Sequence, residues 1–196
     1  MSTDAGGEAT LTPAGERLLA AASGLFYARG IRAVGVDLIA EEAGTTKKTL
    51  YDRFGSKDAL VALYLRRRAD RWKAYVLRHL DAHASGPGVD RVLAVFDALG
   101  EWMDEQDRGC AFVNAYAEIG GTDHPGVAVI RADKQWMRAL FERLVSDAAE
   151  VGVPGSDVVG AQLHLLYEGA IVATTAGGQQ DSLEHARRAA RRLLEQ

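Results

Sequence analysis

The sequence predicts an all-α protein made of a small head and a larger helical body. Apolar residues recur at intervals of three and four along most of the chain, as they do on one face of an α-helix. Glycine and proline interrupt this pattern, most clearly at residues 84–88, and no segment alternates apolar and polar residues like a half-buried strand. We therefore expect a three-helix head at residues 12–55 and a six-helix body at residues 56–196. Residues 1–11 are small, polar and rich in glycine, and are expected to form a disordered arm.

The composition is that of an ordinary globular protein, with 47% hydrophobic and 26% charged residues among 196. No apolar run is long enough to span a membrane and the N-terminus lacks a signal-peptide pattern, so a cytoplasmic location is expected. The formal net charge is −4, yet residues 1–83 hold 13 Lys and Arg against 10 Asp and Glu. The positive excess of this half suits a DNA-binding surface better than the overall charge does.

The first helix has clear signals at both ends. Thr12 can cap its N-terminus, Pro13 suits the first helical position, and Gly30 can end it. One apolar stripe runs between these ends and consists of Leu18, Leu19, Ala22, Leu25 and Phe26. This stripe should form the core of the head.

Residues 36–54 have the pattern of a helix-turn-helix. An apolar helix follows Gly35, Gly44 supplies a residue that tolerates positive φ, and Thr46 can cap a second helix at residues 47–54. Two helices joined by so few residues must cross steeply, which exposes the start of the second. Hydroxyl groups, methyl groups and positive charge gather there, as in helices that read DNA: Thr45, Thr46, Lys47, Lys48, Thr49 and Tyr51.

The body is expected to contain one long and five shorter helices. Ser56 can cap the long helix, which continues to about residue 83. The last helix should begin with a capping box formed by Asp181 and Glu184. The remaining expected ranges are 89–107, 111–119, 125–151, 156–176 capped by Ser156, and 181–194. The apolar stripe of the helix at 125–151 is expected to consist of Val129, Trp136, Leu140, Leu144 and Ala148.

Residues 12–65 resemble the DNA-binding domain of the TetR family of bacterial transcriptional regulators. The matching positions are Ile39-Ala40, Gly44, Thr46-Lys47-Lys48-Thr49-Leu50-Tyr51, Phe54 and Ser56-Lys57-Asp58-Ala59-Leu60. Thr45 and Lys48 depart from the common residues of the family. The resemblance implies that Lys47, Tyr51 and Lys57 bind phosphates, that Thr45 and Lys48 read bases, and that Leu50 and Phe54 are core.

The resemblance also implies a function. Members of the family act as homodimers on a palindromic double-stranded DNA operator, and a small-molecule effector bound in the body usually releases the repressor. Within the body, polar or aromatic residues on apolar helices are the candidates for effector binding. They are Trp102, Cys110, Asn114, Trp136, His164 and Tyr167. No catalytic group, cofactor or metal is expected.

Three features have alternative interpretations. Cys110 can be a buried structural thiol or a redox sensor. His79 and His83 share a helical face and could bind a metal, although a histidine near a helix C-terminus also interacts well with the helix dipole. The arginines at residues 66–68 can be a solvated helical face, or can help the long helix transmit the state of the effector.

Two other classes of protein make different predictions. An enzyme on a helical bundle would need a convergent acid, base or nucleophile, and the sequence offers none. A helix-turn-helix adaptor that binds only protein would show no salt-sensitive DNA binding. Dimerisation is expected through the last two helices, where Leu163, Leu166, Ala170 and Ala173 follow helical spacing.

Overall fold

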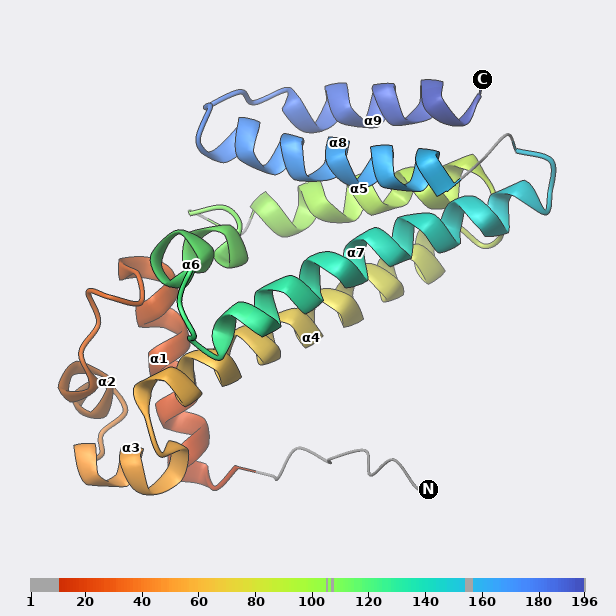
Figure 1. The fold of residues 1–196 in the computed structure, drawn as a ribbon. Helices are drawn as coiled ribbons and strands as arrows, with labels where there is room; N and C mark the ends of the chain where they lie inside the picture. The colour runs from red at the N-terminus through yellow and green to blue at the C-terminus, as the bar shows by residue number, and fades with distance from the viewer. Residues whose placement is uncertain (1–10, 105, 107, 154–156, 196) are drawn as a thin grey trace.

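The fold is all-helical, as the sequence predicted. The computed structural model describes residues 11–104, 106, 108–153 and 157–195, and the helices within these residues are α1 to α9, without a strand. Helices α1, α2 and α3 form a head at one end of the molecule, and α4 to α9 form an elongated body (Figure 1). All but one residue of the expected disordered arm lies outside the described residues. Leu11, the exception, packs against the core of the head.

The head begins with α1 (Pro13–Arg29), whose ends are those predicted. The Thr12 side chain accepts a hydrogen bond from the Gly15 N–H, and Gly30 ends the helix at a φ of 89°. The five residues of the predicted stripe are all buried. They pack against α2, α3 and the start of α4, so the head is organised around α1.

Helices α2 (Val36–Glu42) and α3 (Lys47–Phe54) form the predicted helix-turn-helix. Gly44 has a φ of 60° in the turn between them, and the Thr45 N–H donates to the carbonyl of Ala40. A residue with a Cβ is disfavoured at this φ, so glycine is what allows the turn to be this tight. Leu50 is fully buried, whereas Phe54 is half-buried against the same cluster.

Helix α4 (Lys57–His83) joins the head to the body, and the Ser56 side chain caps it by accepting from the Ala59 N–H. Its first half belongs to a hydrophobic cluster with the head, α6 and the start of α7, while its second half belongs to the cluster of the body. Buried contacts thus continue across residue 55. The domain boundary there stays a prediction.

The body is a bundle of mostly antiparallel helices. Helix α7 packs between α4 and α8, and α9 covers α8 and α5 on the outer side (Figure 1). Their bounds are α5 (Val89–Asp104), α6 (Ala111–Ile119), α7 (Gly126–Ala149), α8 (Asp157–Thr175) and α9 (Ser182–Leu194). In the described part of the chain, no helix is both long enough and apolar enough to cross a bilayer.

Among the local predictions for the body, the capping box of α9 is wrong and the stripe of α7 is only partly right. Asp181 precedes α9, but its side chain makes no capping hydrogen bond and instead lies 3.6 Å from the imidazole of His185 one turn further on. In α7 the predicted Leu140, Leu144 and Ala148 are buried, but Val129 and Trp136 are only partly buried. The first half of the buried stripe runs instead through Ile130 and Met137. Adjacent positions both belong to a broad apolar face, so periodicity alone misjudged its centre. Ser156, the expected cap of α8, lies outside the described residues.

Candidate DNA interface and effector cavity

The exposed face of the head is the N-terminal turn of α3. The Thr46 side chain accepts from the Thr49 N–H at 3.1 Å and so begins the helix at Lys47. Leu50 anchors the opposite face in the core. Of the residues predicted to contact DNA, Thr46, Lys47, Lys48 and Tyr51 are exposed, and Thr45 and Thr49 are half-buried. The turn therefore presents one continuous polar surface.

The two lysines of this surface take part in exposed ion pairs. Lys47 lies 3.2 Å from a carboxylate oxygen of Asp37 on α2, and Lys48 lies 2.6 Å from one of Asp52 on its own helix. Ion pairs this exposed contribute only about 0–1 kcal/mol each. Phosphate groups can therefore replace the carboxylates at little cost.

Lys57, the third lysine of the predicted interface, is held differently. Its ammonium donates to the Ile31 carbonyl at 2.6 Å and lies 5.9 Å from the centre of the Phe26 ring. Partial burial lowers the pKa of Lys57, against the opposing effect of the carboxylates of Asp58 and Glu118. Lys57 thus ties the loop after α1 to the start of α4, a structural contact that the sequence did not predict.

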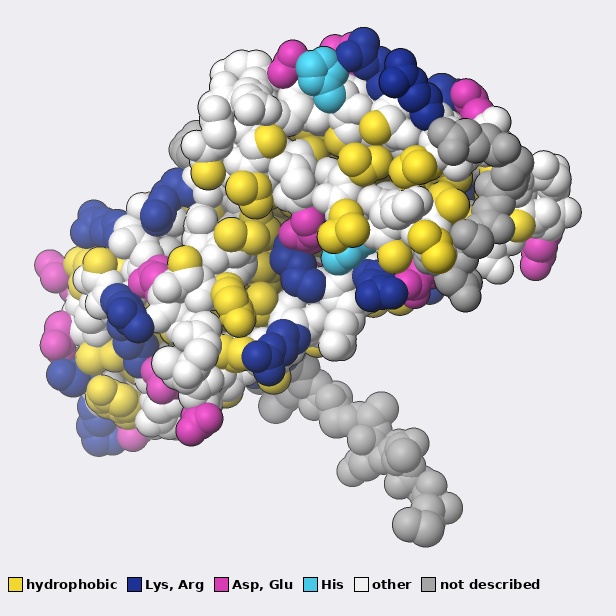
Figure 2. Space-filling model, turned by 45° about the horizontal axis from the view of Figure 1, so that its top comes forward, with side chains coloured by type: hydrophobic (Ala, Val, Ile, Leu, Met, Phe, Trp, Pro, Cys, Tyr) yellow, Lys and Arg dark blue, Asp and Glu magenta, His cyan; other side chains and the backbone are white. Residues whose placement is uncertain are grey.

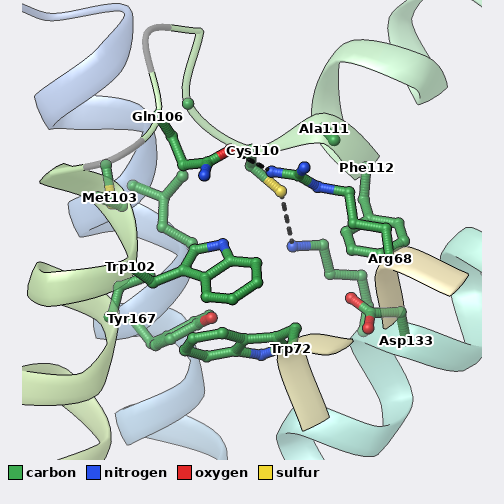
Figure 3. Close-up of a pocket in the computed structure, with 14 residues that line it drawn as sticks. Arg68, Trp72, Trp102, Met103, Gln106, Cys110, Ala111, Phe112, Asp133 and Tyr167 are labelled. Atoms are coloured by element: carbon green, nitrogen blue, oxygen red, sulfur yellow. Dashed lines mark hydrogen bonds between the residues drawn. The ribbon is translucent and has the colours of Figure 1, made fainter. Parts of the chain in front are cut away.

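A cavity in the body lies between α4, α5, α7, α8 and the start of α6 (Figure 3). Its volume is about 40 Å³. A water molecule needs roughly 10–15 Å³ measured in this way, so the cavity has room for a few waters but not for an organic molecule. Aromatic, aliphatic and charged side chains line it together: Arg68, Trp72, Leu99, Trp102, Met103, Gln106, Gly109, Cys110, Ala111, Phe112, Asp133, Lys134, Tyr167 and Ile171.

The cavity brings together three of the six residues predicted to bind an effector, namely Trp102, Cys110 and Tyr167. The other three do not line it. Asn114 donates to the Arg108 carbonyl at 2.8 Å on the side of α6 that faces the head, and Trp136 lies under the ammonium of Lys73. His164 packs behind Tyr167, with its ring 6.4 Å away.

The charged residues of the cavity were not predicted from the sequence. Arg68 is buried and donates to Gln106 at 2.7 Å, so the interpretation of residues 66–68 as a solvated face is wrong for this arginine. Asp133 and Lys134 also line the cavity. A signal for Asp133 did exist, because it falls between Ile130 and Met137 on the buried stripe of α7, where an acidic residue is unusual.

Asp133 and Lys134 have different electrostatic surroundings. Burial raises the pKa of Asp133 to about 6, although Lys134, Lys73 and Arg68 act in the opposite direction. Its Oδ1 atom is buried without a hydrogen-bond partner. The Lys134 ammonium instead lies 2.8 and 2.9 Å from the two carboxylate oxygens of Glu168 and 3.6 Å from the Cys110 sulfur. Burial opposes the charge of Glu168, but hydrogen bonds from His164 and Lys134 lower the pKa of this carboxyl overall.

Hydrogen bonds connect the wall of the cavity to the head. The Tyr27 hydroxyl on α1 donates to the Gly109 carbonyl and accepts from the Arg108 N–H, both at 3.0 Å. Arg108 in turn donates from its guanidinium to the Tyr27 carbonyl at 2.8 Å. The guanidinium of Arg68, inside the cavity, stacks 4.7 Å from the centre of the Tyr27 ring. One tyrosine of the head is therefore in contact with two parts of the cavity wall.

Helix α6 makes a second connection to the head. The two carboxylate oxygens of Glu118 accept from the N–H groups of Ile31 and Arg32 at 2.9 and 2.7 Å. These N–H groups belong to the segment between α1 and α2. Since Cys110 and Ala111 line the cavity at the other end of α6, this short helix spans the distance between cavity and head.

The histidines that suggested a metal site have other partners. His79 is buried beside Glu101, with 3.3 Å between Nδ1 and Oε2, and the ring of His83 stacks on it at 4.2 Å. Among the described residues, no group of three or more His, Cys, Asp or Glu side chains is arranged to hold a metal ion.

A helix-turn-helix head with an exposed second helix, carried on a helical body, defines a DNA-binding regulator. Residues 18–64 match the family described as bacterial regulatory proteins of the tetR family, and residues 88–190 match the tetracyclin repressor-like C-terminal domain. The chain belongs to the TetR family, whose members regulate transcription and are not enzymes.

Three relatives illustrate the similarity. The crystal structure of SCO4454, a TetR-family regulator from Streptomyces coelicolor, is 32% identical, with a TM-score of 0.81 over 93% of this chain and 96% of that one. Reduced NemR from E. coli is 23% identical, with a TM-score of 0.75 over 91% and 96%, and supports the fold alone. The transcriptional activator FasR of Mycolicibacterium smegmatis is 35% identical over 126 residues, which are 64% of this chain but only 44% of FasR.

Proposed function

We propose that this TetR-family regulator is a homodimeric repressor that binds a palindromic operator through α3 and releases it when a small molecule enters the cavity of the body. The observation that carries the proposal is the hydrogen-bonded connection between cavity and head through Tyr27 and Glu118. A ligand can change DNA binding only if it binds two states of the protein differently. The connection gives the cavity a physical means of favouring one arrangement of the head.

For the head, we assign base readout to Thr45 and Lys48, and phosphate contacts to Lys47, Tyr51 and Lys57. Thr46 and Thr49 complete the surface and hold the turn in place. Lys48 has the most exposed side chain of the lysines on α3, at 83%, and its partner Asp52 belongs to the same helix. It can turn toward a base edge without disturbing any contact between elements.

For the dimer, we assign the outer face of α8 and α9. Val158, Leu165 and Val172 on α8 are 63%, 70% and 47% exposed, which is unusual for large apolar side chains on one helix. Leu165 also lines a groove between α8 and α9, together with Gln162, Leu166, Ala189, Arg192 and Leu193. Figure 2 shows hydrophobic side chains gathered over this part of the body, with Lys and Arg side chains along their edge. Two copies of this face, related by a twofold axis, would form a four-helix interface.

For the response to effector, we assign the cavity lined by Trp102, Cys110 and Tyr167. At about 40 Å³ it must expand to admit an organic molecule. Expansion pushes on residues 109–111, because they form part of the cavity wall and Gly109 is hydrogen-bonded to Tyr27 of the head. Movement of this segment breaks or shifts the hydrogen bonds to Tyr27, and α6 carries the displacement to Ile31 and Arg32. The head then moves relative to the body, and the spacing of two heads in a dimer no longer fits the operator.

Activation is the second candidate for the sense of control. FasR, which is 35% identical over 126 residues, is named a transcriptional activator. Repression needs only occupation of the promoter, whereas activation also needs a contact with the transcription machinery. Transcription in vitro from a promoter with the selected operator separates the two. Addition of the protein lowers transcript yield if it is a repressor and raises it if it is an activator.

The proposal as a whole is tested by selecting bound fragments from random DNA with the purified protein. We expect a palindromic consensus whose half-sites are one helical turn apart, and a steep fall in affinity with salt. Repeating the binding measurement with libraries of small molecules should identify compounds that release the DNA. Recovery of no consensus, together with no salt-dependent DNA binding, would favour the adaptor class instead.

A further inference from the structure

One carboxyl group in the cavity wall has an oxygen atom without a hydrogen-bond partner. Asp133 is 2% exposed, and its Oδ1 atom has no hydrogen-bond partner among the described residues. In Figure 3 the carboxyl is turned toward the space between Trp72 and Cys110. A buried carboxylate without a partner costs free energy unless the group becomes neutral or a partner arrives. Asp133, with a pKa of about 6, is mainly ionised at neutral pH, and its Oδ1 atom can accept a hydrogen bond from a ligand that enters the cavity.

The two cations that line the cavity already have partners of their own. The Lys134 ammonium lies between both carboxylate oxygens of Glu168, at 2.8 and 2.9 Å. Arg68 donates to Gln106 and stacks on Tyr27, with the guanidinium carbon 6.0 Å from the centre of the Trp102 ring. An anionic ligand would face the carboxylate of Asp133. Because Lys134 and Arg68 both have acceptors, the buried side-chain atom of the cavity wall that lacks a hydrogen-bond partner in the described part of the chain is itself an acceptor, the Oδ1 atom of Asp133.

The opposite walls of the cavity are aromatic. Trp72 and Trp102 meet edge to face with their ring centres 5.4 Å apart, and Tyr167 lies beside them (Figure 3). The indole N–H of Trp72 points away toward the sulfur of Met137 at 3.0 Å. Faces of aromatic rings attract cations, and Trp does so most strongly. The same rings bury the apolar part of a ligand.

We propose that the effector is an organic cation, a protonated amine on an aromatic or apolar body, whose ammonium donates to Asp133 while its body packs on Trp72, Trp102 and Tyr167. This inference rests on the proposed function, because it assigns the chemical class of the molecule that the cavity admits. An ammonium supplies both the charge and the N–H donors that Oδ1 lacks. A neutral hydrocarbon of the same shape would leave the carboxylate buried without a partner.

Three probes of matched shape test the inference on the full-length protein: benzylamine as the cation, ethylbenzene as the neutral analogue and phenylacetate as the anion. Their dissociation constants are measured by calorimetry at pH 7.5. We expect benzylamine to bind at least about tenfold more tightly than ethylbenzene, the effect of one hydrogen bond to a charged group. In Asp133→Asn this preference should disappear. The control Asp147→Asn makes the same chemical change on α7 outside the cavity and should keep it.

The inference is overturned if phenylacetate or ethylbenzene binds most tightly, if the preference for benzylamine survives in Asp133→Asn, or if none of the three probes binds. DNA binding without any probe is measured in parallel on the wild type and on Asp133→Asn. A wild type that fails to bind DNA overturns the proposed regulatory function, while the preference of the cavity for a cation is judged by calorimetry alone.

Discussion

At the scale of single residues, Asp133 shows how the burial of one carboxyl group can lower the stability of a fold. Its burial moves the pKa from 3.8 to about 6, which means that the folded state disfavours the charged form relative to the unfolded chain. Between these two values the folded protein binds the proton more tightly than the unfolded chain does. The free energy of unfolding therefore falls as the pH rises through this window and levels off above about 6.

We predict that Asp133→Asn is more stable than the wild type at pH 7.5, by on the order of 2–3 kcal/mol, because the variant no longer buries a charge. Between pH 5 and pH 7.5 the free energy of unfolding of the wild type should fall by on the order of 1 kcal/mol, whereas that of the variant should not. Urea unfolding of both proteins at the two pH values measures this. Parallel changes in the two proteins would mean that Asp133 is not the group that titrates in this window.

Lys48 is the residue on which sequence preference is expected to depend. If Lys48 reads a base, Lys48→Ala should reduce discrimination between the operator and a variant base at the contacted position by about 1–3 kcal/mol. Tyr51→Phe should instead weaken binding to all sequences alike, because a phosphate contact carries no sequence information. Fluorescence anisotropy with matched duplexes gives both affinities. Arg188→Ala, which also removes a positive charge but lies on α9, should leave the discrimination intact, and the assignments are wrong if Lys48→Ala does so too.

At the scale of elements, α6 matters because it is short and makes contacts at both of its ends. Cys110 and Ala111 lie in the cavity wall, and Glu118 binds the backbone of Ile31 and Arg32 in the head. The glycine at position 30 fits this arrangement, since a Cβ there would lie 2.9 Å from a carboxylate oxygen of Glu118. The close approach of α6 to the head therefore depends on both residues.

We predict that Glu118→Ala separates the two functions of the protein. The variant should keep its fold and its affinity for effector, but the effector should no longer release DNA, because α6 has lost its hold on the head. Amide exchange at Ile31 and Arg32 should quicken by about tenfold, corresponding to on the order of 1 kcal/mol for each lost hydrogen bond. Glu118→Gln keeps one acceptor and should show an intermediate effect. A fully effector-responsive Glu118→Ala protein would exclude α6 as the connection.

At the scale of the whole molecule, two leucines of α8 mark the difference between the proposed dimer interface and the core of the body. Leu165 is 70% exposed, whereas Leu163, two residues earlier, is fully buried and belongs to the core of the body. Gly160 also faces the inside of the protomer, because a Cβ at this position would lie 2.7 Å from the Cα atom of Glu142 on α7. The face available to a second copy is therefore narrower than the full apolar stripe of the helix.

We predict that Leu165→Glu gives a helical monomer, since a twofold interface would place two new charges against apolar side chains. Leu163→Glu should instead unfold the body, because it buries an unpaired charge in the core. Sedimentation and circular dichroism, applied to both variants, make the comparison. A Leu165→Glu protein that remains dimeric would show that the interface lies on another face.

Much of the fold could be predicted from local chemistry. The N-terminal ends of α1 and α3 follow from Thr12, Pro13 and Thr46, and the tight turn of the helix-turn-helix follows from Gly44. Each of these residues acts on backbone atoms no more than a few residues away. For the same reason the polar surface of α3 could be identified in full, although its DNA contacts remain predictions. The sequence by itself thus determined the helices, their order and the kind of protein they form.

Only the tertiary structure decided which side chains share the cavity. Arg68, Trp102 and Asp133 come from three helices, and periodicity indicates which face of a helix is apolar but not which neighbour that face meets. Asn114, Trp136 and His164 were predicted from their polarity or size on apolar helices, and lie outside the cavity because packing turned each of them elsewhere. Hydrogen-bond partners for Asp133 would have to come from neighbouring helices. Whether its Oδ1 atom is paired is therefore a property of the assembled bundle and not of any one segment of the chain.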